Sequence, residues 1–326
     1  MTDAVDLESE RERRALESEL AGRYRLEREL GRGAMSFVYL AWDLRHDRPV
    51  ALKALRAEIA SAIGPVRFSR EIHIVAQLVH PNIVGLIDSG VAESGSDAPP
   101  IPWFVMPYVE GESLRQRLRR EAQLPVDEAI RIASDVAEAL EYAHHHNIVH
   151  RDIKPENILL SGGQAMVADF GVARLVAASD PGLSSSAGIA VGTPYYMSPE
   201  QWAAEPNLDG RSDLYSLACV VYEMLSGEPP FTGATAETIR ARHRSQPVPS
   251  LHIARPSLPE YVEATLERAL AKAPADRFRT VTEFTTALQK GELPPMTRRR
   301  RGLQVLAATD SLAAEIVRLV RRAIGR

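Results

Sequence analysis

Hydrophobic residues recur with two different periodicities along the chain. The change from one to the other divides the chain into two parts. Between residues 24 and 108, apolar runs of strand length recur between turn residues, while Phe68, Ile72, Val75 and Leu78 stand near helical spacing and predict a helix over 65–80. The strand-like runs are 25–30, 38–41, 50–55 and 103–106. Later apolar residues recur at helical spacing, which predicts helices from Asp127 and over 213–225, 261–272 and 282–290. A strand-rich part is therefore expected before a larger helical part.

Size and composition add limits to this picture. At 326 residues the chain exceeds the usual size of one hydrophobic core, so two lobes or domains are expected. A net charge of −4 argues against a general nucleic-acid binder. The polar N-terminus lacks the apolar core of a signal peptide, and the apolar stretches are shorter than the ~18–20 residues of a membrane span. We therefore expect a soluble protein.

The one cysteine, Cys219, lies in the apolar run 217–221. This position favours a buried structural thiol over a reactive one. Because a single cysteine forms no internal disulfide, a reducing, cytoplasmic setting fits the sequence.

Both ends of the chain differ in composition from the part between them. Residues 1–22 carry seven acidic and three basic side chains within the first twenty, which predicts a frayed helix or a disordered arm without assigned chemistry. Residues 298–326 hold eight arginines and two acids, with Leu312, Ile316, Leu319 and Ala323 on one helical face. Three interpretations of this arginine-rich tail stay open: a docked helix, a dimer or partner helix, and a helix on anionic membrane.

Candidate chemistry is concentrated in the octet His-Arg-Asp-Ile-Lys-Pro-Glu-Asn, residues 150–157. It offers a base in Asp152, a cation in Lys154 and a metal ligand in Asn157. Twelve residues after Asn157, Asp169 begins an Asp-Phe-Gly triplet and supplies a second carboxylate. Turn chemistry would explain any one of these residues, but not the whole set at this spacing. The set suits divalent-cation-assisted phosphoryl transfer.

These motifs resemble those of the eukaryotic-type (Hanks-type) protein kinases, and Lys154 with the Pro-Glu-Asn ending resembles the serine/threonine branch, most of all its bacterial members. The resemblance covers roughly residues 24–290. It implies an α+β bilobal fold, with a small, mainly antiparallel β N-lobe carrying one regulatory helix and a larger, mainly α C-lobe. The expected organisation is a charged arm over 1–22, the N-lobe over 23–108, the C-lobe over 109–290, and a linker and tail over 291–326.

A glycine-rich loop, Gly31-Arg32-Gly33-Ala34-Met35-Ser36, leads into Phe37 and Val38. A dinucleotide-binding turn would require a helix after the glycines, whereas residues 37–40 read as a strand. Strand–loop–strand suits a flap that lays backbone N–H groups over phosphates. Ser36 replaces the third glycine of the kinase pattern, a small residue that leaves room for phosphates and stiffens the flap.

A single lysine, Lys53, interrupts the apolar strand 50–55. From the strand alone it could reach solvent at a sheet edge; by resemblance it is the lysine that holds the α- and β-phosphates of ATP. Its implied partner is Glu71 in the helix 65–80. Glu58 is the alternative, although it precedes the helix-breaking pair Gly64-Pro65.

The resemblance implies ATP and Mg²⁺ as cofactors. Asp152 and Lys154 would act on the transferred group together with Lys53 and Glu71, and Asn157 and Asp169 would hold Mg²⁺. Pro107 departs from the glutamate common in the family and has no N–H, so the Val109 amide is expected to serve adenine instead. The expected nucleotide contacts are Leu30, Gly31, Arg32, Gly33, Ala34, Met35, Ser36, Phe37, Val38, Ala51, Lys53, Met106, Tyr108, Val109 and Leu159.

A long segment, 172–197, is rich in Ser, Ala and Gly, and it resembles a kinase activation segment. Its end, 192–200, places Thr193 for substrate docking and carries Ser198 where alanine is commoner. Ser184, Ser185 and Ser186 are candidate phosphorylation sites whose phosphate Arg151 would receive, and a plain flexible linker is the alternative.

Three further residues are implied as structural. Glu200 is expected to pair with Arg277, and Asp213 to hold the backbone of the catalytic loop rather than act only as a helix cap. The triplet His144-His145-His146 is not expected to bind one metal ion, because neighbouring side chains at a helix end point in different directions. Their position near a helix C-terminus is the plainer explanation.

The sequence thus predicts a serine/threonine protein kinase that acts on protein substrates and phosphorylates its own activation segment. A pseudokinase scaffold is the alternative, although such proteins usually lack the lysine, the base or the metal aspartate. A small-molecule phosphotransferase of related fold would lack the long activation segment. A homodimer is left open, as is membrane contact through the arginine-rich tail.

Overall fold

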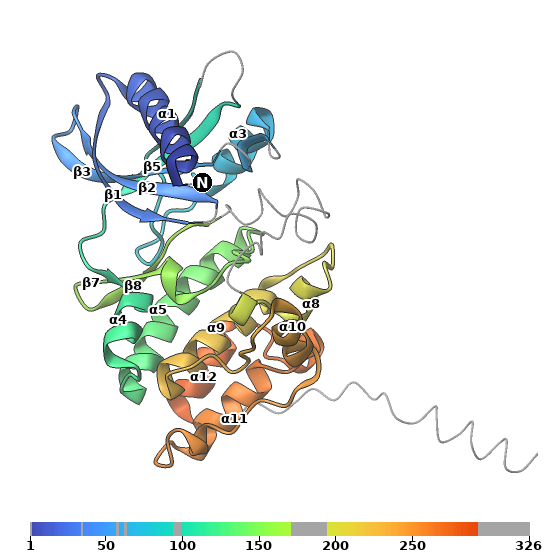
Figure 1. Cartoon of the computed structure of the whole chain (residues 1–326). Coiled ribbons are helices and arrows are strands. Elements are labelled where there is room, and N and C mark those ends of the chain that lie inside the picture. The colour runs from blue at the N-terminus through green and yellow to red at the C-terminus, as the bar shows by residue number, and fades with distance from the viewer. Residues whose placement is uncertain are drawn as a thin grey trace, which may run out of the picture. The chain divides into compact units, whose positions relative to one another are not determined.

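The computed structural model describes residues 2–33, 35–56, 59–61, 64–93, 99–170 and 194–292. Residues 1–292 form one compact unit, and the arginine-rich tail lies outside the described residues. Figure 1 shows a strand-rich upper part and a helical lower part. This arrangement agrees with the α+β fold expected from the sequence.

Within the described residues, five antiparallel strands form the sheet of the upper part in the order β1-β2-β3-β5-β4. Two irregularities interrupt the pairing of β1 with β2, between Leu26 and Arg28 and between Glu29 and Gly31, where the glycine-rich loop begins. The strands are β1 (Tyr24–Arg32), β2 (Ser36–Asp43), β3 (Arg48–Leu55), β4 (Asp88–Ala92) and β5 (Ile101–Pro107).

Helices pack on both faces of this sheet. Trp103 and Val105 of β5 belong to one apolar cluster, while Phe104 between them belongs to another, as strand alternation requires. The first cluster includes Leu16 and Leu20 of α1 (Thr2–Leu20). The second includes residues of α3 (Pro65–Val75), which ends five residues before the predicted boundary at 80.

Helix α1 resolves the two alternatives left open for residues 1–22. Leu16 and Leu20 are 1% and 0% exposed, so the C-terminal half of α1 is part of the core of the strand-rich lobe. The charges made this segment look like a solvated arm, but an apolar pair at i and i+4 gives the helix a buried side.

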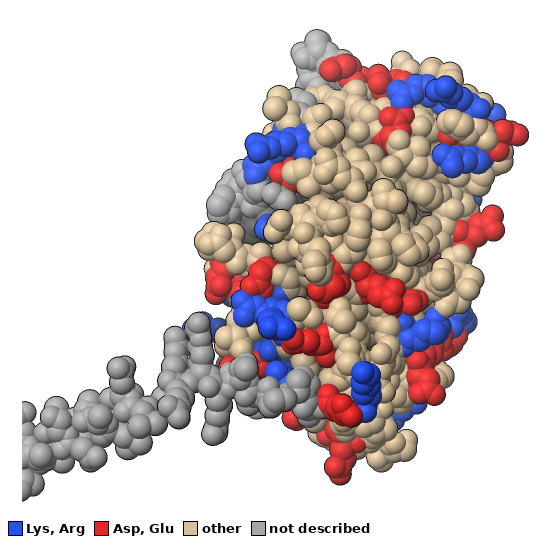
Figure 2. Space-filling model, turned by 180° about the vertical axis from the view of Figure 1, so that it is seen from behind, with Lys and Arg blue, Asp and Glu red and all other residues tan. Residues whose placement is uncertain are grey.

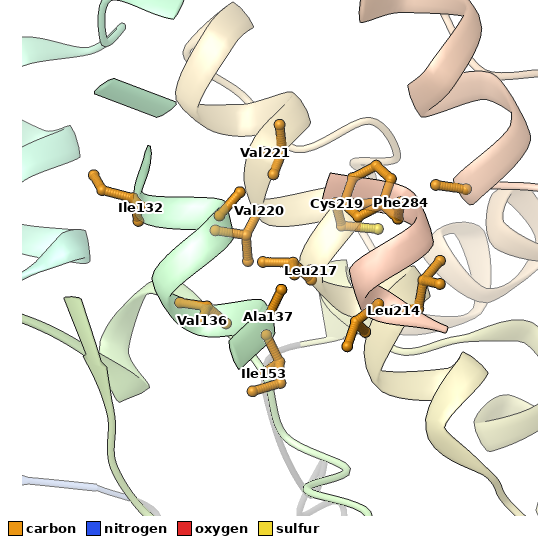
Figure 3. Packing of buried hydrophobic residues seen from close by; sticks show 14 of the residues in the cluster. Ile132, Val136, Ala137, Ile153, Leu214, Leu217, Cys219, Val220, Val221 and Phe284 are labelled. Carbon is orange, nitrogen blue, oxygen red and sulfur yellow. The ribbon is translucent and has the colours of Figure 1, made fainter. Parts of the chain in front are cut away.

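The helical part is built around α9 (Gly210–Ser226), whose residues Ser212 to Leu225 are all buried. Figure 3 shows its apolar side chains meeting Ile132, Val136 and Ala137 of α5 (Val126–His145) and Phe284 of α12 (Val281–Lys290). Cys219 is fully buried in this core, where burial raises the pKa of its thiol. This placement agrees with the structural role expected from its sequence context.

The remaining elements of this part surround the α5–α9–α12 core. A small antiparallel sheet, β6-β7-β8, lies beside α5 and faces the upper part. These elements are β6 (Glu112–Ser113), α4 (Leu114–Glu121), η1 (Pro155–Asn157), β7 (Ile158–Ser161), β8 (Gln164–Val167), η2 (Pro194–Tyr196), α8 (Pro199–Trp202), α10 (Ala236–Ser245), η3 (Leu251–Ile253), α11 (Glu260–Ala269) and η4 (Pro274–Asp276).

Hydrogen bonds tie the segment 82–84 to β8 of the helical part. The Val84 amide donates to the Val167 carbonyl at 2.9 Å, and the Val167 amide donates to the Asn82 carbonyl at 2.8 Å. The Asn82 side chain donates to the Ala165 carbonyl at 2.9 Å. The segment that leads into β4 is therefore anchored on β8, just before Asp169.

Charged groups are mixed on the surface. On the face shown in Figure 2, Lys and Arg are interspersed with Asp and Glu. None of the described helices is both long and apolar enough to span a membrane.

A buried ion pair fastens α8 to the segment after α11. Arg277 donates to both carboxylate oxygens of Glu200, at 2.6 and 2.8 Å, and to the carbonyls of Ala271, Arg211 and Lys272. Both side chains are buried. Burial alone would raise the pKa of Glu200, but the hydrogen bonds and charge of Arg277 keep it below its usual value.

We predict that Leu16→Ala destabilises the protein by about 2–4 kcal/mol, because it leaves a cavity between α1 and the sheet. Denaturant unfolding followed by tryptophan fluorescence would measure the change. Glu19→Ala, an exposed change on the same helix, is the matched control. Equal stability of the two variants would contradict the docking of α1.

We predict that Arg277→Met lowers the free energy of unfolding by about 3–5 kcal/mol, because it leaves the Glu200 carboxylate buried without its partner. The double variant Glu200→Gln, Arg277→Met removes that charge and should recover part of the loss. Urea titrations of both variants would decide this, and a double variant no more stable than Arg277→Met would contradict it.

Candidate active site

The octet 150–157 is held from below by the first turn of α9. The Asp213 carboxylate is fully buried and accepts the amide N–H groups of His150 and Arg151, each at 2.8 Å. It also lies 2.8 Å from Nε2 of His144. Burial raises the pKa of Asp213, but hydrogen bonds and charge from His144 outweigh it and hold the pKa below its usual value. Asp213 is thus placed to fix the backbone next to Asp152.

His150 joins the octet to the segment that carries Asp169. Its Nδ1 accepts the Asp152 amide at 3.2 Å, so its proton is on Nε2, which donates to the Ala168 carbonyl at 2.9 Å. Its ring packs edge-on against the ring of Phe170, with 4.5 Å between the two ring centroids. The backbone N–H of Ala168 donates a hydrogen bond to the Asn157 carbonyl at 2.9 Å. These contacts fix the two candidate acidic residues relative to each other.

Asp152, Lys154 and Asn157 meet in one cluster. The Lys154 ammonium donates to Oδ2 of Asp152 at 2.7 Å. The side-chain Nδ2 of Asn157 donates to the same oxygen at 3.1 Å and to the backbone carbonyl of Asp152 at 2.9 Å. Two donors therefore orient a carboxylate that is only partly buried and open to a further partner.

Lys53 reaches Asp169 from β3. Its Nζ donates to Oδ2 of Asp169 at 2.6 Å, across 116 residues of sequence. Burial raises the pKa of Asp169, but the charge and hydrogen bond of Lys53 hold it below its usual value. Asp169 has a φ of +67°, a left-handed conformation that non-glycine residues rarely adopt and that is common at functional sites.

The residues present fit a magnesium ion. Oδ1 of Asp169 is buried and has no hydrogen-bond partner in the part of the chain that is described. Asn157 uses its Nδ2 on Asp152, which leaves its amide oxygen for a cation. The described residues contain no cluster of three His, Cys, Asp or Glu for a metal. Mg²⁺ is commonly held by only one or two protein oxygens, with phosphates and water completing its shell.

Four of the expected adenine contacts, Val38, Ala51, Met106 and Leu159, lie on β2, β3, β5 and β7. Ala51 of β3 pairs with Met106 of β5, and Val38 of β2 pairs with Lys53. Gly111 follows the hinge residues Tyr108 and Val109, with a φ of +155°. A Cβ on Gly111 would stand 2.0 Å from the Leu160 carbonyl oxygen. Glycine is therefore required for the hinge to approach β7, the strand that carries Leu159.

Some sequence-predicted residues are not brought together by the described contacts. Glu71 lies half-buried on α3, while the ion pair described for Lys53 is with Asp169. The Lys53–Glu71 pair therefore stays a prediction. Glu58, Ala34, Thr193 and the candidate phosphorylation sites Ser184, Ser185 and Ser186 lie outside the described residues.

The three consecutive histidines have three separate partners, as expected from their directions. His144 contacts Asp213, while the Nδ1 atoms of His145 and His146 lie 2.7 and 2.8 Å from the carbonyls of Glu141 and Tyr142. His144 also explains Gly210, where a Cβ would stand 2.4 Å from the imidazole.

One buried polar cluster was missed by sequence reasoning. Arg115 of α4 donates to Glu156 in the octet at 2.8 Å, to Glu223 of α9 at 2.6 Å, and to the Tyr196 hydroxyl. Tyr196 in turn donates to Glu223 at 2.5 Å. Its members are scattered over the chain, so no local motif reveals them. The only signal was Glu223, a charge within the otherwise uncharged run 214–225.

The chain was compared with families of known proteins and with individual relatives. Residues 24–289 match the protein kinase domain family. The chain is 41% identical over 296 residues to the probable serine/threonine-protein kinase PknB of Bifidobacterium longum, which covers 89% of this chain and 42% of that protein. It is 42% identical over 283 residues to the serine/threonine-protein kinase PknB of Mycobacterium tuberculosis, covering 85% of this chain and 44% of the relative.

Among solved structures, the PknI kinase domain of Mycobacterium tuberculosis matches with a TM-score of 0.64 and 33% identity, over 83% of this chain and 97% of that one. The chain spans less than half the length of the two curated relatives. The matched region includes both parts of the fold and every described residue of the candidate site. The chain therefore belongs to the protein kinase domain family, within its bacterial, Hanks-type serine/threonine branch.

Proposed function

We propose that this protein is an ATP-dependent serine/threonine protein kinase, which transfers the γ-phosphoryl group of Mg-ATP to hydroxyls of protein substrates. The observation that carries the proposal is the convergence of Lys53, Asp152, Lys154, Asn157 and Asp169 from distant segments. A base, two cations and two metal-binding oxygens are the groups that phosphoryl transfer requires.

Asp152 is the proposed base. Its carboxylate would orient the substrate hydroxyl and accept the hydroxyl proton as the hydroxyl oxygen bonds the γ-phosphorus, while the bond from the γ-phosphorus to the bridging oxygen breaks and ADP leaves. Lys154, 2.7 Å from the same carboxylate, offsets negative charge on the group in transfer. Catalysis here is positioning and electrostatics, because the transition state is loose and little covalent work falls to the protein.

Lys53, Asp169 and Asn157 are the proposed holders of the nucleotide phosphates. The Lys53 ammonium has three donors and uses one on Asp169, so others are available to the α- and β-phosphates. Asp169 and Asn157 would hold Mg²⁺, which supplies positive charge that offsets the charge of the phosphates. The loop 31–36 would cover the phosphates, and Ala51, Val38 and Leu159 would enclose the adenine.

Regulation through the activation segment is part of the proposal. Phosphate on Ser184, Ser185 or Ser186 would pair with Arg151, which precedes the base. Arg151 has a φ of +69°, and its carbonyl accepts the Gln201 side chain at 2.7 Å, so its backbone is linked to the docking end of the segment. Thr193 would meet Asp152 and Lys154 at that end.

The pseudokinase alternative has less support than turnover. The lysine, the proposed base and the proposed metal aspartate are all present, and the contacts of Lys53 with Asp169 and of Lys154 with Asp152 support turnover. The buried Cys219 thiol fits action in the cytoplasm, where thiols stay reduced.

We predict that Asp152→Asn lowers kcat by about 10²–10⁴-fold, because it removes the base and keeps the shape. Transfer of label from γ-labelled ATP to a protein substrate measures kcat, and a separate ATP titration should show retained binding. Asp276→Asn, on an exposed turn, is the control. Near-normal turnover of Asp152→Asn would show that another group is the base. Absent transfer by the unmodified chain, despite ATP binding, would support the pseudokinase alternative.

We predict that Lys53→Met abolishes detectable transfer, because the phosphates lose their cation and Asp169 loses its partner. Lys290→Met, at the exposed end of α12, should leave transfer unchanged. The same labelling assay, followed by mapping of phosphorylated residues, tests both variants. Label on the unmodified chain within 184–186, and none on Lys53→Met, is the expected result.

A further inference from the structure

A cluster of side chains lies beside the glycine-rich loop and takes no part in the proposed transfer. It comprises Glu29, Arg32, Phe37 and Arg56, and we call it the loop clamp. Phe37 is 3% exposed, and the guanidinium carbons of Arg32 and Arg56 lie 4.8 and 4.7 Å from the centre of its ring. Each cation is within the range of an attractive cation–π contact. One aromatic ring therefore holds two arginines.

Arg56 contacts the loop at two points and the residue after the loop at a third. Its backbone N–H donates to the Met35 carbonyl at 2.9 Å, and its Nε donates to the Gly33 carbonyl at 3.2 Å. Its guanidinium lies over Phe37, which directly follows the loop. The Gly33 amide closes the turn itself by donating to the Ser36 carbonyl at 2.8 Å. Arg56 thus contacts residues on both sides of the turn between β1 and β2.

The position of Arg56 links the clamp to the proposed phosphate lysine. Arg56 directly follows Leu55, the last residue of β3, and stands three residues after Lys53. Side chains an odd number of residues apart in extended chain point to opposite faces, so Lys53 faces Asp169 while Arg56 faces away. One strand therefore presents the lysine to the site and holds the loop from the other side.

Two cations on one ring would repel each other without a counter-charge. Glu29 supplies it, accepting two hydrogen bonds from Arg32 at 3.1 and 2.9 Å. These bonds, with the charges of Arg32 and Arg56, keep the pKa of Glu29 below its usual value against the effect of burial. The carboxylate is ionised at neutral pH and offsets one of the two positive charges of the clamp.

We propose that Arg56 is a positioning residue for the nucleotide, which holds the glycine-rich loop at a fixed place relative to Lys53. The phosphates then bind under a loop that is already in place. The product ADP dissociates slowly, because the loop opens infrequently. This inference rests on the proposed function, since it takes the loop to be the cover of the phosphates. Loosening the clamp opens the loop without altering the groups that act on the phosphoryl group.

The test compares three full-length variants with the unmodified chain. Arg56→Met removes the guanidinium and keeps most of the apolar length. Phe37→Leu keeps an apolar side chain and removes the π face. Arg28→Met is the control, because Arg28 is exposed on β1 of the same sheet and makes none of the described hydrogen bonds or ion pairs.

Two measurements are made on each variant. Hydrogen exchange of the amides in 31–37 is followed without nucleotide, and the dissociation rate of a fluorescent ADP analogue is followed in stopped flow. The KM for ATP, the KM for a protein substrate and the melting temperature complete the set. The first two readouts do not depend on phosphoryl transfer, so the clamp can be judged even where transfer fails.

In Arg56→Met, the rate of exchange of the loop amides and the rate of ADP dissociation should each rise by about tenfold. The KM for ATP should rise by the same factor, which corresponds to the loss of one hydrogen bond to a charged group. Phe37→Leu should change the same quantities by about two- to fivefold, the factor of a partly exposed cation–π contact. The KM for the protein substrate should match that of Arg28→Met in both variants. The melting temperature should match it in Arg56→Met, whereas Phe37→Leu should lower it because Phe37 is buried.

Exchange and ADP release equal to those of Arg28→Met would overturn the proposal. Faster exchange with unchanged ADP release would also overturn it, since the clamp would then order the loop without positioning the nucleotide. A lowered melting temperature with proportionate changes in both KM values would assign Arg56 to general stability instead. Failure of the unmodified chain to phosphorylate any protein, with the expected exchange and ADP results, would reject the proposed function and keep the clamp.

Discussion

A single buried carboxylate, that of Asp213, sets the geometry of the catalytic loop. Removing a charge from water is costly, and the cost is offset here by two backbone N–H donors and one imidazole at 2.8 Å each. Because the two N–H groups belong to consecutive residues, the carboxylate fixes the orientation of two adjacent peptide planes. Arg151 accepts a φ of +69° as a result, and the next residue, Asp152, faces the site.

The strand-rich part uses alternation to separate two tasks. On β3 and β5, the side that bears Lys53 and Phe104 meets α3, while the side that bears Ala54 and Trp103 meets α1 and the loop clamp. Chemistry and support are therefore built from neighbouring residues of the same strands. A shift of one residue in the pairing of β3 would exchange the two sides, so the register is under strong constraint.

Much of this arrangement could be predicted from local patterns. The octet, the Asp-Phe-Gly triplet and the lone lysine in an apolar strand are local in sequence, and their chemistry can be read directly. The helices predicted at 261–272 and 282–290 were found at Glu260–Ala269 and Val281–Lys290, since apolar spacing depends only on neighbours. The strands that α1 packs against could not be predicted, because charges dominate its composition and it contacts both β1 and β4, which are far apart in sequence. The Arg115 cluster and the loop clamp were missed for the same reason: their members meet only after the sheet and helices have formed.

Helix α9 carries polar contacts at both ends of its buried length. Asp213 near its start holds the octet, and Glu223 near its end holds Arg115 and Tyr196, while Ser216 between them donates to the Tyr196 carbonyl at 2.7 Å. The number of residues between the two acids therefore sets the distance from the octet to the turn η2, which carries Tyr196. One residue added or lost between them would rotate one acid by about 100° around the axis and shift it by about 1.5 Å. Such a length change would leave one carboxylate buried without its partners, so this stretch of the chain can vary in its apolar side chains but not in its length.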